Sequence, residues 1–394
     1  MNIGIDASRA FIGKRTGTEE YSYQFIKNLT KVDLFSHQIF LYIRRNSAID
    51  FDLPQNFTVK EIQYNKFWTQ IGLSKEMKKN SIDILFIPSH AVPFIHPKNT
   101  VVTIHGLEFK HYPECYSFKE KFLLEVNTLF SIKWSNKIIV PSESSKKDLI
   151  KFYGVDGNKI RVVYHGVTFC HCEEKRRNIP ITMHTSHNIT MGENSKGVAK
   201  SSCGTSHNDN PYILFIGRLE KRKNIINLIK AFELFKKITP HSFLQRGNLN
   251  YKLILAGKVG FGFKEIKKAI QKSPFKKDII LKKYVSKEEK EGLYKKADLF
   301  ILLSFYEGFG LTILEAMSYG VPVICSNTSS LPEVAGKAAL LINPNNTQEI
   351  TEAMSKIFND DDLRNKMIEK GFENVKKFSW GKCARETMDV LLGC

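Results

Sequence analysis

The chain has 394 residues, of which 42% are hydrophobic and 25% charged; this composition fits a globular protein with room for two cores. No apolar run approaches the roughly 18 residues of a membrane-spanning helix, and the N-terminus opens as a strand without a basic leader, so we expect a cytoplasmic protein. The seven cysteines are odd in number and scattered, which favours a reducing compartment over a disulfide framework.

The net charge of +19 predicts attraction to a polyanion. Three interpretations stay open: solvated lysine-rich helix faces, association with an anionic membrane surface, and binding of an anionic substrate. Nucleic acid is not expected as a partner, because the basic residues are not interleaved with a recognition module.

Residues 1–168 alternate short apolar runs with helical patterns, which indicates a parallel, doubly wound sheet. The expected strands are Asn2–Asp6, Gln38–Ile43, Phe57–Ile62, Asp83–Pro88, Thr100–His105, Lys137–Val140 and Arg161–Tyr164. The expected helices are Glu19–Leu29, Ser117–Trp134 and Ser144–Phe152. Ligands of such sheets bind beyond the carboxyl ends of the strands.

Two features lie at those ends. The loop Arg9–Thr18, which contains Gly17, follows the first strand and precedes a helix; it is either a ligand-binding loop or an ordinary turn. His105 ends the fifth strand, where it is either a structural histidine or a group that donates a hydrogen bond to a developing negative charge.

Residues 169–210 break this alternation. They are rich in Ser, Thr, Asn and Gly, which is typical of a polar interdomain linker or insertion that is extended or disordered. The segment also holds Cys170, His171, Cys172, His184, His187, Cys203 and His207. Their spacing matches no standard zinc pattern, so we favour a linker over a zinc site.

Regular alternation resumes with the strand Tyr212–Ile216 and the helix Ile225–Lys237. Arg218 and Lys223 lie on the connection between them, where a guanidinium and an ammonium group can neutralise phosphate; a basic surface turn is the alternative. Further strands are expected at Tyr251–Ala256, Ile279–Leu281 and Ala338–Ile342, and further helices at Gln348–Phe358 and Trp380–Leu391.

The most informative stretch is 299–326. An apolar run, Leu299–Leu303, leads through a glycine-rich turn into a helix from Leu311, and Val321–Cys325 forms the next strand. Small residues before a helix N-terminus suit a phosphate-bearing ligand. Glu315 is the only carboxylate between Gly308 and Ser326, so we expect it to face a polar cleft; a solvent-facing Glu315 is the alternative.

Several ordered segments resemble the family 4 glycosyltransferases, which are retaining nucleotide-sugar enzymes of the GT-B fold with mannosyltransferase-like members. These segments are "TIHGLEF", "VPSESSKKDLIKFYGVDGNKIRVVYHGV", "FIGRLEKRKNIINLIKAF" and "YEGFGLTILEAMSYGVPVICS". The resemblance implies two Rossmann-like domains that face a cleft: an acceptor domain at 1–168 and a nucleotide-sugar domain at 211–379. A C-terminal helix at about 380–394 would pack back on the first.

The resemblance also implies the function: a retaining transfer of a hexose from a nucleotide sugar to a glycan or lipid-linked acceptor in cell-surface polysaccharide synthesis. GDP-mannose is the favoured donor. No metal or other cofactor is expected. The implied catalytic residues are Glu307, His105, Arg218 and Lys223. The implied nucleotide-sugar-binding residues are Gly17, Val285, Phe309, Gly310, Leu311 and Glu315. Glu19 and Glu20 depart from the uncharged or basic residues common in the family, which leaves the acceptor contacts open.

Three rival functions stay open. A nucleotide-sugar epimerase or a phosphorylase could use the same architecture, and the net charge alone would fit a non-catalytic polyanion-binding protein. The acidic runs at 50–52 and 360–362 are interpreted as structural, the first as a loop and the second as a helix start.

Overall fold

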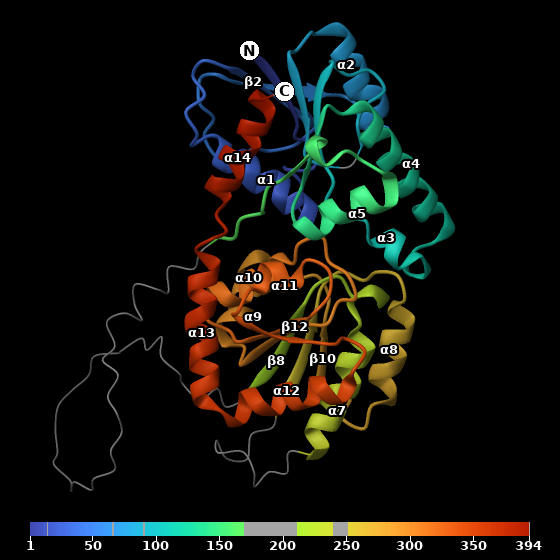
Figure 1. The fold of residues 1–394 in the computed structure, drawn as a ribbon, viewed down its shortest axis with the longest axis vertical. Coiled ribbons are helices and arrows are strands. Elements are labelled where there is room, and N and C mark those ends of the chain that lie inside the picture. The colour runs from blue at the N-terminus through green and yellow to red at the C-terminus, as the bar shows by residue number, and fades with distance from the viewer. Residues whose placement is uncertain (14, 65–66, 90, 169–210, 239–250, 394) are drawn as a thin grey trace, which may run out of the picture.

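The computed structural model describes residues 1–13, 15–64, 67–89, 91–168, 211–238 and 251–393. They form two lobes, each a parallel sheet covered by helices (Figure 1). The expected linker at 169–210, with the cysteines and histidines that were weighed against it as a zinc site, lies outside the described residues.

The N-terminal lobe contains a seven-stranded sheet in the order β3-β2-β1-β4-β5-β6-β7. Its strands are β1 (Asn2–Asp6), β2 (Gln38–Arg44), β3 (Phe57–Ile62), β4 (Ile84–Ile87), β5 (Asn99–Thr103), β6 (Lys137–Val140) and β7 (Ile160–Val162). Its α-helices are α1 (Gly17–Leu29), α2 (Ser74–Lys79), α3 (Glu108–His111), α4 (Phe118–Trp134) and α5 (Glu143–Tyr153). A π-helical turn, Trp68–Leu73, precedes α2.

The C-terminal lobe contains a six-stranded sheet in the order β10-β9-β8-β11-β12-β13. Its strands are β8 (Tyr212–Ile216), β9 (Lys252–Ala256), β10 (Ile279–Lys282), β11 (Leu299–Leu302), β12 (Val323–Ser326) and β13 (Ala339–Ile342). Its helices are α7 (Ile225–Ile238), α8 (Phe263–Lys272), α9 (Lys287–Lys296), α10 (Leu311–Ser318), α11 (Leu331–Ala335), α12 (Thr347–Asn359) and α13 (Asp361–Val375).

Both sheets are doubly wound and share one topology. The strand order reverses between β1 and β4 in one lobe and between β8 and β11 in the other, and every pairing between these strands is parallel. Strands β4, β8, β11 and β12 are buried along their whole length, which explains their unbroken apolar sequences. The loops after β1, β4, β8 and β11 therefore occupy the two topological switch points, where ligands of such sheets bind.

The chain passes between the lobes twice, and the two passages lie side by side. Val163 belongs to the core of the N-terminal lobe and Val167 to that of the C-terminal lobe, while Phe378 and Trp380 mark the return. Val167 N–H donates to the Phe378 carbonyl across 3.1 Å. The last helix, α14 (Trp380–Leu392), then packs beside α1 in the N-terminal lobe (Figure 1).

Two helices of the C-terminal lobe bury few of their side chains completely. Ile266 is the one fully buried side chain of α8 and Tyr294 that of α9, among ten residues in each helix. By contrast, the acidic run 360–362 does start a helix, because the Asp360 carboxylate accepts the Leu363 N–H at 2.8 Å as the N-cap of α13.

Candidate functional site

The connection after β8 places Lys223 at the end of a 3₁₀ turn, Lys221–Lys223. The next residue, Asn224, adopts the left-handed region at φ 55°, which a short polar side chain tolerates better than most. Its side-chain amide donates to the Pro344 carbonyl at 2.6 Å. This anchored turn starts α7 at Ile225 and directs Lys223 toward the loop that follows β11.

Glu307 lies in that loop and is 9% exposed. Its carboxylate forms an ion pair with Lys223 and accepts a hydrogen bond of 2.6 Å from the Ser304 hydroxyl. Arg222 lies 3.6 Å from its second oxygen. The Glu307 N–H donates to the Ser329 hydroxyl at 2.9 Å. The two switch-point loops of the C-terminal lobe thus meet in one buried polar cluster.

The cluster sets the protonation of Glu307. Burial by itself raises the pKa of this carboxyl, but the charges of Lys223 and Arg222 and hydrogen bonds from Lys223 and Ser304 outweigh burial and hold the pKa below its ordinary value. Glu307 is therefore ionised at neutral pH. Two further hydrogen bonds hold the Arg222 guanidinium in place: it donates to the Glu220 carboxylate at 2.7 Å and to the Tyr306 carbonyl at 2.6 Å.

Arg218 differs from these buried groups. Its side chain is 61% exposed and lies 3.7 Å from the Glu220 carboxylate. Glu220 is thus shared by the buried Arg222 and the exposed Arg218, which connects Arg218 to the Glu307 cluster while leaving most of its guanidinium open to solvent.

Glu315 lies on α10 and faces α9. Lys290 donates to one carboxylate oxygen at 2.6 Å and the Tyr294 hydroxyl donates to the other at 3.0 Å. Burial lowers the pKa of Lys290, but the negative charges of Glu315 and, more weakly, Glu20 on α1 produce a net rise. Glu20 of the N-terminal lobe therefore lies near this group.

The loop around Glu307 is also held by the N-terminal lobe, mainly through α5. The Gly308 carbonyl accepts hydrogen bonds from Ser142 at 2.8 Å and Ser145 at 3.3 Å. The Tyr306 hydroxyl donates to Asp148 at 2.5 Å. Positions 142, 145 and 148 recur every three residues, so one face of α5 holds both neighbours of Glu307. We call these contacts the α5 clamp.

His105 lies across the lobe boundary from the same loop. A Cβ added at Gly308 would come within 1.7 Å of the His105 carbonyl oxygen, so only glycine permits this approach. The His105 ring is 2.8 Å from the Pro88 carbonyl and packs edge-on against Tyr21 at 4.9 Å. The strand itself ends at Thr103 rather than at His105.

A second histidine, His165, lies beside His105 with ring centroids 5.4 Å apart. Among the described residues, neither of its ring nitrogens has a hydrogen-bond partner. Burial, with a smaller contribution from His105, holds the pKa of His165 well below its usual range. It is therefore a neutral side chain that packs among the rings of Tyr21, Phe309 and Trp380.

The remaining expected residues surround the same region. Gly310 is the N-cap of α10 with φ 102°, a conformation that favours glycine. In the described part of the chain, the N–H groups of Phe309, Gly310 and Leu311 donate to no other residue, as is common ahead of a helix. Val285 packs against the C-terminal core. A Cβ at Gly17, the first residue of α1, would meet nothing within 4 Å among the described residues.

The two acidic residues that depart from the family pattern have local partners. The Glu19 carboxylate accepts the Thr16 N–H at 3.0 Å in a capping box. Glu20 pairs with Arg15 at 3.1 Å. Across the described ranges, no group of three or more His, Cys, Asp or Glu side chains is placed to hold a metal ion.

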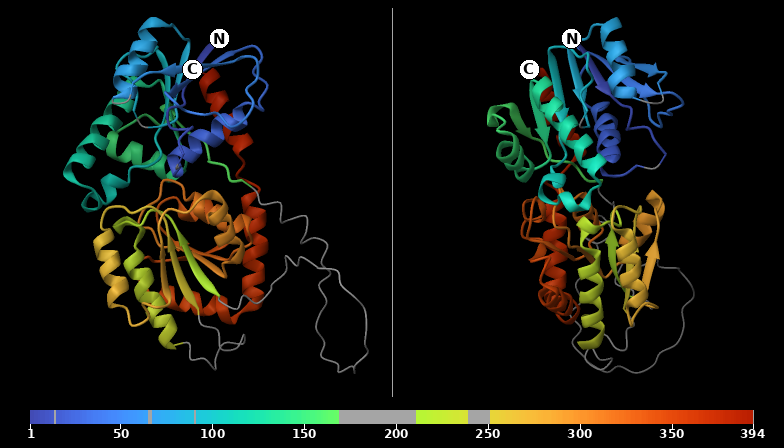
Figure 2. Two further views of the ribbon diagram at one scale, coloured as in Figure 1. Left: turned by 180° about the vertical axis from the view of Figure 1, so that it is seen from behind. Right: turned by 90° about the vertical axis from the view of Figure 1, so that its right-hand side faces the viewer.

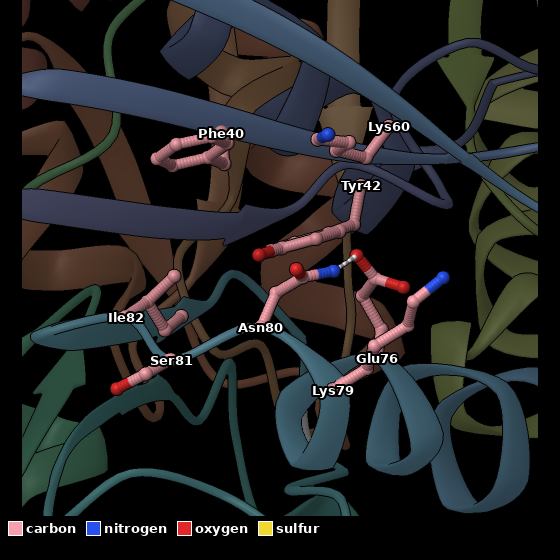
Figure 3. Close-up of a pocket in the computed structure, with 8 residues that line it drawn as sticks. All are labelled: Phe40, Tyr42, Lys60, Glu76, Lys79, Asn80, Ser81 and Ile82. Carbon is pink, nitrogen blue, oxygen red and sulfur yellow. Dashed lines mark hydrogen bonds between the residues drawn. The ribbon is translucent and has the colours of Figure 1, made fainter.

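A polar hollow elsewhere in the N-terminal lobe is separate from this site (Figure 3). It lies between β2, β3 and α2, where Asn80 donates to Glu76 at 2.7 Å. Residues 80–82 lead into β4, so the hollow lies toward the amino end of that strand and away from the switch point.

Comparison with known structures defines the class first. The chain superposes on sucrose-phosphate synthase from Thermosynechococcus elongatus with a TM-score of 0.71 at 16% identity, covering 99% of this chain and 98% of that one. The chain also superposes on WaaG, a glycosyltransferase involved in lipopolysaccharide biosynthesis, with a TM-score of 0.67 at 13% identity over the whole of both chains. The protein has the GT-B fold.

Sequence comparison then identifies the family. Residues 16–169 match the profile described as Glycosyltransferase Family 4 and residues 203–374 the one described as Glycosyl transferases group 1. The chain belongs to the family 4 glycosyltransferases.

Two relatives show how far this similarity extends. The chain is 39% identical to O-antigen chain mannosyltransferase B of Escherichia coli over 179 residues, which is 45% of each protein and so under half of that relative. It is 24% identical over 369 residues to an uncharacterized glycosyltransferase of Methanocaldococcus jannaschii, covering 87% of each.

Several residues that complete the site carry no distinctive signal in the sequence. Arg222, Lys290 and Tyr294 hold the two glutamates, and the α5 clamp holds the loop between them. For Arg222 the sequence offers one indication: it precedes Lys223 directly in a run of three basic residues.

Proposed function

We propose that the protein is a retaining hexosyltransferase that moves a hexose from a nucleotide sugar to a glycan or lipid-linked acceptor in cell-surface polysaccharide synthesis. One observation carries the proposal: Lys223 and Glu307, from the two switch-point loops of one sheet, share a buried cluster beside the exposed Arg218. GDP-mannose is the favoured donor, because relatives in Escherichia coli and Salmonella typhimurium are named as O-antigen chain mannosyltransferases.

In this proposal the donor diphosphate lies between Arg218 and the N-terminus of α10. Arg218 is exposed enough to turn toward phosphate oxygens, and Lys223 has three donor hydrogens, so it can bind phosphate while keeping Glu307. The N–H groups of Phe309, Gly310 and Leu311 and the helix dipole add partial positive charge. As the bond between sugar and diphosphate breaks, negative charge grows on the diphosphate, and these groups stabilise it.

The sugar then lies between Glu307 and His105. Glu307 accepts hydrogen bonds from sugar hydroxyls because its pKa is held low, and His105 polarises the reacting centre from the N-terminal lobe. The acceptor hydroxyl attacks from the face that the diphosphate leaves, which retains the anomeric configuration. Gly17 leaves open space on the acceptor side.

Glu315 is proposed to accept hydrogen bonds from the ribose hydroxyls. Its carboxylate is oriented by Tyr294 and paired with Lys290, which fixes a hydrogen-bond acceptor in the middle of α10. Val285, on the loop after β10, is proposed to border the base.

The test is a panel of GDP-, UDP- and dTDP-sugars, scored by thermal unfolding and by nucleoside diphosphate release with a polyprenyl-linked acceptor. A donor at 100 times its Kd should stabilise the protein by about 2.7 kcal/mol. Arg218→Ala should abolish release, and Glu315→Gln should raise the donor Kd. A panel without any thermal shift would overturn the proposal. Free sugar as the product would identify an epimerase, and steeply salt-dependent DNA binding without release a polyanion-binding protein.

The proposed place of action is the cytoplasmic face of the membrane, where a lipid-linked acceptor and a nucleotide sugar meet. The net charge of +19 supports attraction to anionic lipid. Among the described residues, no helix is both long and apolar enough to cross a bilayer.

A further inference from the structure

His165 lies where the chain first passes from the N-terminal to the C-terminal lobe, three residues beyond the end of β7. Its side chain is 5% exposed, and in the described part of the chain neither ring nitrogen has a hydrogen-bond partner. Buried polar atoms without a partner are rare, because they cost stability. The proposed mechanism does not use this imidazole, so its contacts must explain why the chain keeps it there.

Four aromatic rings from four segments surround the imidazole. The ring centroid of His165 lies 4.5 Å from that of Tyr21 on α1 and 6.0 Å from that of Trp380 on α14. It lies 5.4 Å from His105 and 4.9 Å from Phe309. Aromatic pairs attract one another at these distances. One side chain therefore contacts His105 of the N-terminal lobe and Phe309 of the C-terminal lobe.

The backbone on both sides of His165 is held firmly. The Tyr164 hydroxyl donates to the Glu333 carboxylate at 2.8 Å. A Cβ added at Gly166 would come within 2.1 Å of the Trp380 nitrogen, so only glycine lets the two passages between the lobes lie this close. Figures 1 and 2 show these passages side by side where the lobes meet. The His165 ring therefore projects from a backbone that has little freedom to move.

The rings of His105 and Phe309 belong to residues with roles in the proposed mechanism. His105 polarises the reacting centre, and the Phe309 N–H contributes to binding the diphosphate. Phe309 is 4% exposed, and its ring also packs on Tyr164 at 6.1 Å and on Phe378 at 5.8 Å. The place of its N–H therefore depends on how the ring is packed. A misplacement of about 1 Å in such groups costs about a hundredfold in rate.

We infer that His165 is a positioning residue, whose ring sets the His105 side chain and the Phe309 backbone relative to each other across the boundary between the lobes. The inference deepens the proposed function and rests on it for the roles of those two residues. His165 acts through ring contacts and transfers no proton, because both nitrogens are buried and the imidazole is neutral. Phenylalanine, which has a ring and no unpaired nitrogens, should therefore replace it, whereas alanine should not.

The first test is steady-state kinetics of the full chain well below its Tm. The donor is GDP-mannose, or whichever UDP- or dTDP-sugar the panel selects, with a polyprenyl-linked acceptor. His165→Ala should lower kcat by about a hundredfold and raise KM less, because the displaced groups act mainly as charge develops. His165→Phe should stay within about threefold of the parent kcat and keep the shape of its pH profile.

The matched control removes a buried ring far from the loops of the site. Phe358 is 1% exposed and packs on Tyr251 at 4.3 Å, just before β9 begins. Phe358→Ala should lower Tm, because it leaves a cavity, and should keep the parent kcat. If His165→Ala does not fold, His165→Leu, which fills the volume without a ring, takes its place.

The second test is amide hydrogen exchange of the same proteins without ligand, which measures positioning independently of activity. In the parent, the Ile104 N–H donates to the Ile139 carbonyl and the Glu307 N–H to the Ser329 hydroxyl, both at 2.9 Å. Loss of the ring in His165→Ala should speed exchange at 104–107 and at 305–311 together. His165→Phe should restore the parent rates at both segments.

Three results would overturn the inference. They are a His165→Ala protein with the parent kcat, unchanged exchange at either segment in that variant, and a His165→Phe protein as inactive as His165→Ala. The last result would give the ring nitrogens a chemical role. If the parent releases no nucleoside diphosphate from any donor while His165→Ala still speeds exchange at both segments, the proposed function fails and the coupling across the boundary stands.

Discussion

Replacing Glu307 by alanine should destabilise the protein as well as inactivate it. The change leaves Lys223 and Arg222 in place, both about nine-tenths buried, without the carboxylate between them. Removing one partner of a buried ion pair costs about 3–5 kcal/mol. For a unit the size of the C-terminal lobe, each kcal/mol lowers Tm by about 2–4 °C, so we expect a fall of about 6–20 °C.

The assay is thermal unfolding of the ligand-free protein, followed by circular dichroism. Arg218→Ala is the matched control: it removes a cation from the same region, but from an exposed side chain, so its Tm should stay within about 2 °C of the parent. Glu307→Ala/Lys223→Ala should recover part of the lost stability, because one unpaired cation is removed with the anion. A Glu307→Ala protein that melts with the parent would refute the assignment of a buried, paired carboxylate.

Three further predictions concern the same loop. The folded-state pKa of Glu307 is lowered from 4.5, so the ionised carboxylate contributes its full stabilisation above that pH and loses it as the pH falls through the folded-state pKa. Urea unfolding at a series of pH values should therefore show the free energy of unfolding falling more steeply in acid for the parent than for Glu307→Gln. Equal pH dependence in the two proteins would contradict this. Tyr306→Phe removes the hydrogen bond to Asp148 and should lower kcat more than it raises KM, at a stability cost of about 1.5–3 kcal/mol; an unchanged kcat would exclude a positioning role for the α5 clamp. Gly308→Ala would drive a methyl group into the His105 carbonyl and should separate the lobes, seen as a larger radius of gyration in X-ray scattering, and an unchanged scattering curve would contradict the close approach.

The sequence was sufficient for the strands and the topology, for a physical reason. β1, β3, β6 and β8 begin and end where predicted. β6 and β8 are largely apolar runs bounded by polar or turn residues, whereas β3 begins and ends on a buried apolar residue with mostly exposed residues between. β12 is shifted from the predicted Val321–Cys325 to Val323–Ser326, because Pro322 cannot donate to the sheet. Helix α9 has only two large apolar residues, Leu293 and Tyr294, among its ten, so it leaves no such signal.

The candidate site was predictable only in its chemically distinctive members. Glu307, Lys223 and Glu315 could be located from spacing and resemblance, but Arg222, Ser304 and Lys290, which also contact the two glutamates, could not. Lys290 is one lysine among many in its region, and nothing local singles it out as the partner of Glu315. Such pairs depend on how β10, α9 and α10 pack together, which is information carried by the tertiary structure.

The return of α14 to the N-terminal lobe has a consequence for biosynthesis. Trp380, Met388 and Leu391 fill the same core as Ile3 and Phe25, so a nascent chain that has emerged only as far as β7 has an exposed apolar groove in place of that helix. The N-terminal lobe is therefore completed only after the C-terminal lobe has been synthesised, because α14 is made last. Chaperones would be expected to engage this unfinished groove, and a fragment ending near residue 168 to aggregate unless a peptide covering α14 is supplied.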